Sequence, residues 1–465
     1  MRFKKILLII TLIFFAVSFI YTFYRSEIIN QGLNRDYYLK YYILSLLSLI
    51  FLFFVKKLDE GSSKKITSII IFIFFSLYSF EFILFYNKSN ILNKRQEYFK
   101  NYLKQNEIPF EKRDKFDVYL ETKKKDSNIF LATDPYHFLK TNEQIFPLSS
   151  LSNIKTILCN EYGLLSEYQS DRYGFSNPDF EWESDIDFLI LGDAYAHGNC
   201  VKQEDSISGI LRKLNGGKGV LNFGFGGNGP LIKYAQLREY LNLINVKKVL
   251  WFYSETDDLE GPDFRDPKKF EGLKAELTNN ILKKYIDDLN FSQNLSSKQN
   301  IVDEMSLKKN EEITRKVNIS KKNKNFTLLS LFKLTNLRNY ISKHFTKSKP
   351  EKINQKISKE FKQIINLTSE LLEKKNTQFY FIYITDIDRY SKLDFDSTEN
   401  DYDKIREFID SKKNITLIDL HNEIFAKHQN PLSLFTKQFQ NDYQHYNILG
   451  YKLVSEKIYE IINND

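Results

Sequence analysis

The chain has 465 residues, of which 42% are hydrophobic and 27% charged, and its formal net charge is +8. This length is sufficient for several layers of structure around a sizeable core, and the hydrophobic share is ordinary for a soluble protein. The basic residues lie in lysine-rich tracts without the aromatic interleaving of a nucleic-acid surface, which argues against a nucleic-acid partner. No Cys-x-x-Cys or His-x-x-x-His pattern predicts a metal site, and we expect no cofactor.

Hydrophobic residues are concentrated in three runs near the N-terminus, namely those between Lys5 and Arg25, from Tyr41 to Val55 and from Ile66 to Tyr86. Because about 20 apolar residues span a bilayer core, residues 1–87 are predicted to form a membrane region with three transmembrane helices. The first run is longer than the roughly 7–15 residues of a signal peptide's apolar core and lacks a small-x-small cleavage site, which favours an uncleaved anchor. The second run is short, so a hairpin lying partly in the interface is an open alternative.

Lysine and arginine residues predict the orientation of this region. They precede the first run at Arg2, Lys4 and Lys5 and fill the turn between the second and third runs, at 56–57 and 64–65. The positive-inside rule then makes the N-terminus and this turn cytoplasmic and the C-terminal domain periplasmic or otherwise extracytoplasmic, as at a bacterial inner membrane. One span fewer would put that domain in the cytoplasm. Glu81, the only charged residue of the third run, lies close enough to its end to reach the interface.

Beyond the membrane region, residues 88–153 are predicted to form a polar stalk or lead-in, and residues 154–465 an α/β domain. Cys159 and Cys200 both fall in this domain, where an extracytoplasmic location would allow a disulfide. Such a bridge would close a loop of about 40 residues and stabilise the domain by on the order of 4 kcal/mol. Two buried free thiols are the alternative.

Apolar strands alternate with helix-like segments in the domain, and this pattern predicts a parallel sheet. A Lys- and Asn-rich stretch at about 261–356 is too long for an ordinary connection, so we expect an insertion that forms a lid or a surface for a protein partner. Five parallel strands with helices on both faces fit a flavodoxin-like doubly wound sheet, whose sites lie at the carboxyl ends of the strands. The predicted strands are Phe188 to Leu191, Val220 to Phe223, Lys248 to Tyr253, Phe379 to Thr385 and Thr416 to Leu420.

Four short motifs follow these strands or precede the last helix: Gly192-Asp193-Ala194, Asn222-Phe223-Gly224-Phe225-Gly226-Gly227, Thr256-Asp257-Asp258 and Asp442-Tyr443-Gln444-His445. Their order and positions resemble the SGNH (GDSL-like) hydrolases, in particular membrane-anchored bacterial carbohydrate acyl-esterases and acyltransferases. The segment from Asp171 to Pro178 resembles one that precedes the first motif in such proteins. The resemblance covers about residues 170–462, apart from the insertion.

The resemblance implies a role for each motif residue. His445 corresponds to the general base, Asp442 to the carboxylate that orients it, and Gly227 to the glycine whose N–H faces the oxyanion, five residues after Asn222. Asp193 corresponds to the acid of the first motif, which is usually structural. Two positions depart from the family: Ala194 stands where the nucleophilic Ser is expected, and Asp257 where an oxyanion-binding Asn is expected.

These departures predict that ester hydrolysis by the family mechanism is absent or very weak. Ser254 and Tyr195 are candidates to replace the nucleophile, but a packing or surface role is favoured for both. His445 acting on water directly is a further alternative. His197 lies close enough to the first motif to touch a ligand, and a solvent-facing loop histidine is its alternative.

Three hypotheses follow for the function. The first is a catalytically degenerate, membrane-anchored SGNH-like protein that acts on or binds acylated cell-surface glycans. The second is an active hydrolase or O-acyltransferase that uses water or another nucleophile. The third is a scaffold of a membrane assembly that binds a protein partner through the insertion.

Overall fold

The computed structural model describes residues 2–29, 35–105, 107–141, 143–161, 163–255, 258, 272–324, 331, 333–345, 357–391, 399–436 and 445–464. Asp257, Asp442 and the start of the predicted insertion, at 261–271, lie outside these residues. The chain divides into two compact units, the first of Met1–Leu92 with Asn325–Lys347 and the second of Asn93–Lys324 with Ser348–Asp465.

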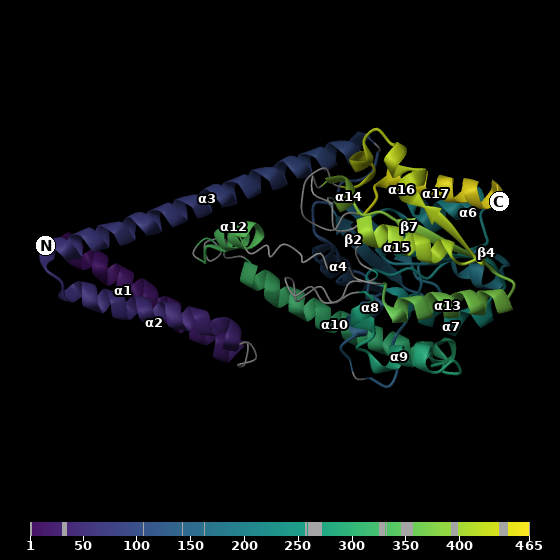
Figure 1. Ribbon diagram of the computed structural model, residues 1–465, viewed down its shortest axis with the longest axis horizontal. Helices are drawn as coiled ribbons and strands as arrows, with labels where there is room; N and C mark the ends of the chain where they lie inside the picture. The colour runs from purple at the N-terminus through teal and green to yellow at the C-terminus, as the bar shows by residue number, and fades with distance from the viewer. Residues whose placement is uncertain are drawn as a thin grey trace. The chain divides into compact units, whose positions relative to one another are not determined.

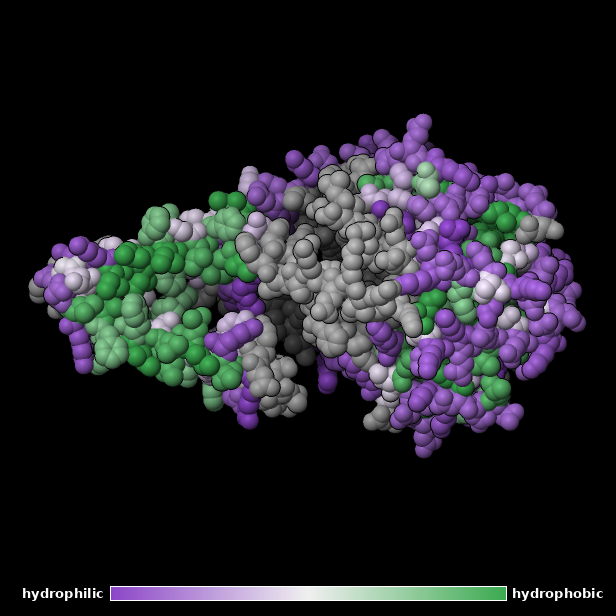
Figure 2. Space-filling model, viewed as in Figure 1, coloured by the Kyte–Doolittle hydropathy of each residue, from purple (hydrophilic) through white to green (hydrophobic). Residues whose placement is uncertain are grey.

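The first unit contains three long apolar helices: α1 (Arg2–Phe23), α2 (Arg35–Lys57) and α3 (Glu60–Gln105, which continues beyond it). The apolar segments Ile9–Ile28, Tyr38–Lys57 and Glu60–Asn90 are long and apolar enough to cross a membrane, and at most 17% of each is buried. Hydrophobic side chains cover their surface, whereas the surface of the second unit is mostly hydrophilic (Figure 2). The prediction of three such helices is therefore confirmed, and the second run forms one of them.

Contacts along the three helices fix which residues lie at the same level. The Ser18 and Ser45 hydroxyls are 3.4 Å apart between α1 and α2. The rings of Phe14 on α1 and Phe74 on α3 lie 5.2 Å apart. A fourth helix of this unit, α12 (Thr335–Phe345), belongs to the predicted insertion.

The second unit is built around a parallel sheet of five strands, in the order β5-β4-β6-β7-β8. In chain order this arrangement is 2-1-3-4-5, the flavodoxin-like doubly wound topology, so the predicted fold class is confirmed. The strands are β4 (Ile186–Leu191), β5 (Val220–Asn222), β6 (Val246–Ser254), β7 (Gln378–Ile384) and β8 (Ile415–Asp419).

Helices cover both faces of this sheet (Figure 1). Leu189 and Leu191 of β4 pack into one hydrophobic cluster with α7 (Pro230–Tyr240) and α13 (Lys359–Lys374). Phe188 and Ile190 point the other way, into a second cluster with the helices α6 (Ile207–Leu214) and α17 (Ile448–Asn464). A strand buried on both faces is a continuous apolar run, which is why β4 was recognisable in the sequence.

Residues 93–153 belong to the second unit, and Phe138, Phe146 and Leu148 from this segment are buried in the same cluster as α7. A smaller sheet joins β1 (Ile129–Leu131) in parallel to β2 (Lys155–Glu161), which pairs antiparallel with β3 (Leu164–Gln169). The remaining helices are α4 (Lys115–Lys123), α5 (Ala194–His197), α8 (Leu273–Glu276), α9 (Asn280–Asp287), α10 (Gln299–Lys324), α14 (Asp388–Ser391), α15 (Glu399–Asp410) and α16 (Leu420–Glu423), together with short 3-10 turns.

Candidate functional site

The first motif forms a tight turn at the carboxyl end of β4. Asp193 is the N-cap of α5, and its carboxylate accepts a hydrogen bond from the Tyr195 amide at 3.0 Å. Gly192 lies so close to its neighbours that an added Cβ would be 2.4 Å from the Ala196 Cβ. Gly198, with φ of +82°, ends the helix after a single turn. The Asp193 carboxylate therefore caps the turn that carries Ala194.

Ala194 is the exposed point of this turn. Its side chain is half-buried, whereas Asp193, Tyr195, Ala196 and His197 are all buried. Ala194 is thus the position in α5 from which a side chain can meet a ligand. It offers a methyl group, which neither attacks a carbonyl carbon nor donates a hydrogen bond.

The second motif is fastened to the first by the side chain of Asn222, at the end of β5. The Asn222 amide nitrogen donates to the Ala196 carbonyl at 2.7 Å, and its amide oxygen accepts from the Gly224 amide at 2.8 Å. The Phe225 amide also donates to the Gly192 carbonyl at 3.3 Å. Asn222 is 1% exposed, so it holds the glycine loop against α5 and does not itself face a ligand.

Gly227 lies at the open side of this loop. It is half-buried and has φ of +71°, a conformation that glycine adopts without strain. The oxyanion-loop role that the resemblance implies for Gly227 stays a prediction.

The segment from Asp171 to Pro178 supports the second motif from behind. The buried Asp171 carboxylate accepts hydrogen bonds from the Tyr173 and Phe175 amides and from the Asn177 and Trp182 side chains. Asn177 in turn exchanges hydrogen bonds with the backbone of Asn222, at 2.8 and 3.0 Å. Burial raises the pKa of Asp171 to about 6 against the effect of these donors. The segment from Asp171 to Pro178 therefore stabilises the end of β5 by hydrogen bonds to Asn222.

His445 lies beside the first motif. Its imidazole is 8% exposed, and its ring centroid is 5.4 Å from that of Tyr195 in an edge-to-face contact. The Thr436 amide and hydroxyl both donate to the His445 carbonyl, at 3.0 and 3.2 Å. The structure therefore places His445 next to Tyr195, in the turn that carries Ala194. Asp442, its expected orienting partner, lies outside the described residues.

His197 is buried, so its alternative as a solvent-facing loop histidine is wrong. It is 3% exposed, and its ring packs 5.4 Å from Tyr168 and 5.0 Å from Phe225. Neither ring nitrogen has a hydrogen-bond partner among the described residues. Burial, assisted by the nearby His445, lowers the pKa of His197 to about 3, so the ring is neutral at physiological pH. His197 is therefore a neutral, buried aromatic residue at the end of α5.

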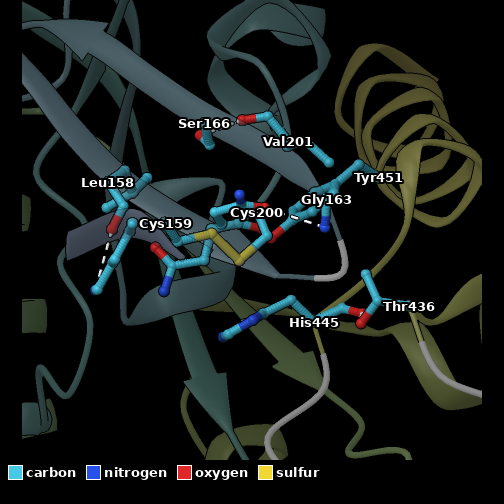
Figure 3. Close-up of a disulfide and its surroundings, with 12 residues drawn as sticks. Leu158, Cys159, Gly163, Ser166, Cys200, Val201, Thr436, His445 and Tyr451 are labelled. Carbon is cyan, nitrogen blue, oxygen red and sulfur yellow. Dashed lines mark hydrogen bonds between the residues drawn. A yellow bond between two sulfur atoms is a disulfide. The ribbon is translucent and has the colours of Figure 1, made fainter. Parts of the chain in front are cut away.

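A disulfide joins Cys159 on β2 to Cys200, three residues after α5, and their Cα atoms are 5.5 Å apart. Figure 3 shows His445 and Thr436 beside this bridge. The Ser166 hydroxyl on β3 donates to the Val201 carbonyl at 2.5 Å, which adds a second tie between the small sheet and the same loop. The loop that follows α5 is thus attached to the small sheet, and the predicted disulfide is present.

The third motif lies after β6, beside a buried ion pair that the sequence analysis missed. The Lys233 ammonium on α7 donates to both carboxylate oxygens of Asp258, at 2.6 and 2.8 Å, and both side chains are fully buried. An Asp258 oxygen accepts from the Ser254 amide at 3.1 Å. Asp257, between these anchors, lies outside the described residues.

The alternative nucleophiles are both enclosed by the fold. Ser254 is 2% and Tyr195 5% exposed, which fits the packing role favoured for them. Within the described residues no three His, Cys, Asp or Glu side chains are grouped as metal ligands. A cavity of about 490 Å³ lies between α4 and α10, and none of its lining residues belongs to the four motifs.

No family model matches the chain, and no curated protein matches it. Solved structures similar to it include a protein of the G-D-S-L family from Desulfitobacterium hafniense DCB-2, at 12% identity and a TM-score of 0.30, covering 59% of this chain and 98% of that one. The esterase EstA from Pseudoalteromonas sp. is 11% identical with a TM-score of 0.31, covering 60% and 98%. The acetyl xylan esterase AlAXEase is 12% identical with a TM-score of 0.31, covering 60% and 100%. The fold class of this chain rests on its own strand order.

Proposed function

We propose that this protein is a membrane-anchored SGNH hydrolase-like protein that binds acylated cell-surface glycans and no longer hydrolyses esters by the family mechanism. The observation that carries the proposal is Ala194, a half-buried methyl at the first position of α5, next in the chain to Tyr195, whose ring contacts His445. The resemblance expects a Ser hydroxyl at that position.

The loss of the hydroxyl removes the family's covalent step. Without an oxygen at position 194 no acyl-enzyme forms there, and removal of the nucleophile costs on the order of 10⁶ in turnover in a well-studied serine hydrolase. Asp257 adds to this, because an ionised carboxylate accepts hydrogen bonds and cannot donate one to an oxyanion. Loss of one such donor costs roughly 10² to 10³.

The remaining parts of the site support binding in place of catalysis. Buried hydrogen bonds hold the glycine loop and the α5 turn in place, and they are made by the side chains of Asn222, Asp193 and Asp171. A turn held in this way positions backbone N–H groups for a carbonyl oxygen whether or not a nucleophile is present.

The positions of the lysines and the disulfide both support an extracytoplasmic location for the C-terminal domain. Lysines at 56–57 end the second apolar helix and lysines at 64–65 lie in the first turns of the third, and the positive-inside rule assigns this end of both helices to the cytoplasm. The third helix then leads to the far side of the membrane. The Cys159–Cys200 disulfide fits an oxidising compartment.

The test compares the full-length protein in detergent with Ala194→Ser, with Ala194→Ser/Asp257→Asn and with His445→Ala. Ala426→Ser, at an exposed position, is the matched control. Hydrolysis of a chromogenic acetyl ester and binding of an acetylated xylo-oligosaccharide, by calorimetry against its deacetylated form, are the two readouts.

We expect the unmodified protein to be inactive but to prefer the acetylated oligosaccharide, and only the double variant to gain hydrolysis. Turnover by the unmodified protein that His445→Ala abolishes would establish the alternative of an active hydrolase using water. Absence of binding to either oligosaccharide, together with no gain in the double variant, would contradict the proposal.

A further inference from the structure

Glu81, the charged residue inside the third apolar run, is fully buried and hydrogen-bonded to the insertion. Its carboxylate accepts from the Leu337 amide at 2.6 Å, from the Asn336 amide at 3.0 Å and from the Asn336 side chain at 2.8 Å. Both amides belong to the first turn of α12. Unpaired N–H groups at a helix N-terminus favour a negative charge, so α12 provides the partner that an intramembrane carboxylate needs.

Residues of α12 and just before it also contact the other two apolar helices. The Lys333 ammonium lies 5.0 Å from the ring centroid of Tyr21 on α1, and the Arg338 guanidinium 5.7 Å from that of Tyr41 on α2. The rings of Tyr340 and of Phe80 on α3 are 5.7 Å apart. Residues 333–340 therefore touch all three helices.

These contacts lie at one level, near one end of the helices. Phe14 and Phe74 are in contact, and Tyr21 and Glu81 each follow seven residues later, about 10 Å further along. The apolar run continues from Glu81 only to Tyr86, about 8 Å beyond it. Glu81 thus lies at the depth at which interfacial helices bury their apolar face, about 5–10 Å into the boundary between headgroups and acyl chains.

The outer surface of α12 suits lipid. Leu337, Tyr340 and Ile341 follow the i, i+3, i+4 spacing of one helix face. Leu337 is buried and the Tyr340 ring packs on Phe80, whereas Tyr340 and Ile341 remain 37% and 43% exposed. Arg338 lies off this face, on an exposed position. An apolar stripe beside basic residues, continuous with the apolar surface of three candidate spans, is the pattern of a helix that lies in the membrane interface.

We propose that α12 is a membrane-interface helix that binds the lipid of the leaflet where the third span ends, and that Glu81 holds it there. The chain of the insertion, which leaves the domain after α10 and rejoins it at α13, is then tethered to the membrane at this point. This inference does not depend on the proposed glycan-binding function.

Cysteine cross-linking in the full-length protein in phosphatidylethanolamine/phosphatidylglycerol vesicles tests the contact. The pair Phe80→Cys/Tyr340→Cys should cross-link on mild oxidation, whereas Phe82→Cys/Tyr340→Cys should not, because Phe82 lies on a different face of α3. Adding Glu81→Ala should lower the yield roughly tenfold, as expected for the loss of a charge-assisted hydrogen bond. Glu60→Ala, at an exposed carboxylate, should leave it unchanged.

Lipid contact is measured with a fluorophore on Ile341→Cys in the same vesicles. Nitroxide-labelled lipid should quench it, and aqueous iodide should quench it only after Glu81→Ala. Glu81→Gln keeps an acceptor and the side-chain shape, so it should give an intermediate result even if Glu81→Ala disrupts the helices. Equal cross-linking with and without Glu81, or a label quenched by iodide and not by lipid in the unmodified background, would overturn the proposal.

Discussion

The side-chain amide of Asn222 donates to the carbonyl oxygen of Ala196, and this bond connects the glycine loop to the turn that displays Ala194. Asn222→Ala removes it together with the bond to the Gly224 amide. Because the Ala196 carbonyl and the Gly224 amide are buried and would lose their partners, we expect the free energy of unfolding to fall by roughly 1–3 kcal/mol. Urea denaturation followed by circular dichroism measures this. Asn414→Ala, at an exposed position, should change it by less than about 0.5 kcal/mol.

His197 should make the protein sensitive to acid. Its pKa is lowered from the ordinary value of 6.5 to about 3 in the folded state. Between these two pH values the imidazole is protonated in the unfolded chain and neutral in the folded chain. Stability is then fully present above pH 6.5 and is lost, by up to about 1.4 kcal/mol per pH unit, as the pH falls towards 3. His197→Phe should reduce this slope. Denaturation at pH 8, where the ring is neutral in both states, isolates the packing effect, and an unchanged acid slope would refute the assignment.

The buried pair of Lys233 and Asp258 should be strongly coupled. Lys233→Met leaves a buried carboxylate without its cation, which typically costs about 3–5 kcal/mol. Lys233→Met/Asp258→Asn should cost less than the single change, because no charge is then buried unpaired. A double variant as unstable as the sum of both single variants would show that the pair is not coupled.

The same pair predicts a loss of stability as the pH rises from about 4 to 7. Burial raises the pKa of Asp258 to about 7, so its contribution is present below the unfolded value near 4 and is lost as the pH rises through 7. Without the Lys233 ammonium the carboxyl is harder still to ionise. Lys233→Met should therefore lose less stability, relative to the unmodified protein, at pH 5 than at pH 8, as thermal unfolding at both pH values would reveal.

The Cys159–Cys200 disulfide should stabilise the second unit. Its loop spans 41 residues, and removal of the bridge by Cys159→Ser/Cys200→Ser should cost about 2–4 kcal/mol. Reductant should lower the unfolding midpoint of the unmodified protein to a similar extent and leave the double variant unchanged. A midpoint that does not respond to reductant would mean that the bridge contributes little.

Several features of this protein could be predicted from local patterns of residues. Apolar runs of the right length predicted the three long helices, and buried strands alternating with helices predicted the five-stranded parallel sheet. With only two cysteines, Cys159 had one possible partner within the chain. The sequence also gave the chemical identity of Ala194, which decides what the site can do whatever surrounds it.

The tertiary structure alone decided which distant residues meet. The sequence around His197 does not predict that Tyr168 and Phe225 bury it. Its neutral state follows from that burial. Glu81 and Leu337 are 256 positions apart, so no periodic pattern links them. Lys233 reads as a surface lysine until Asp258 is placed beside it. Burial and pairing are properties of the packed chain, because they depend on neighbours that folding brings together from remote segments.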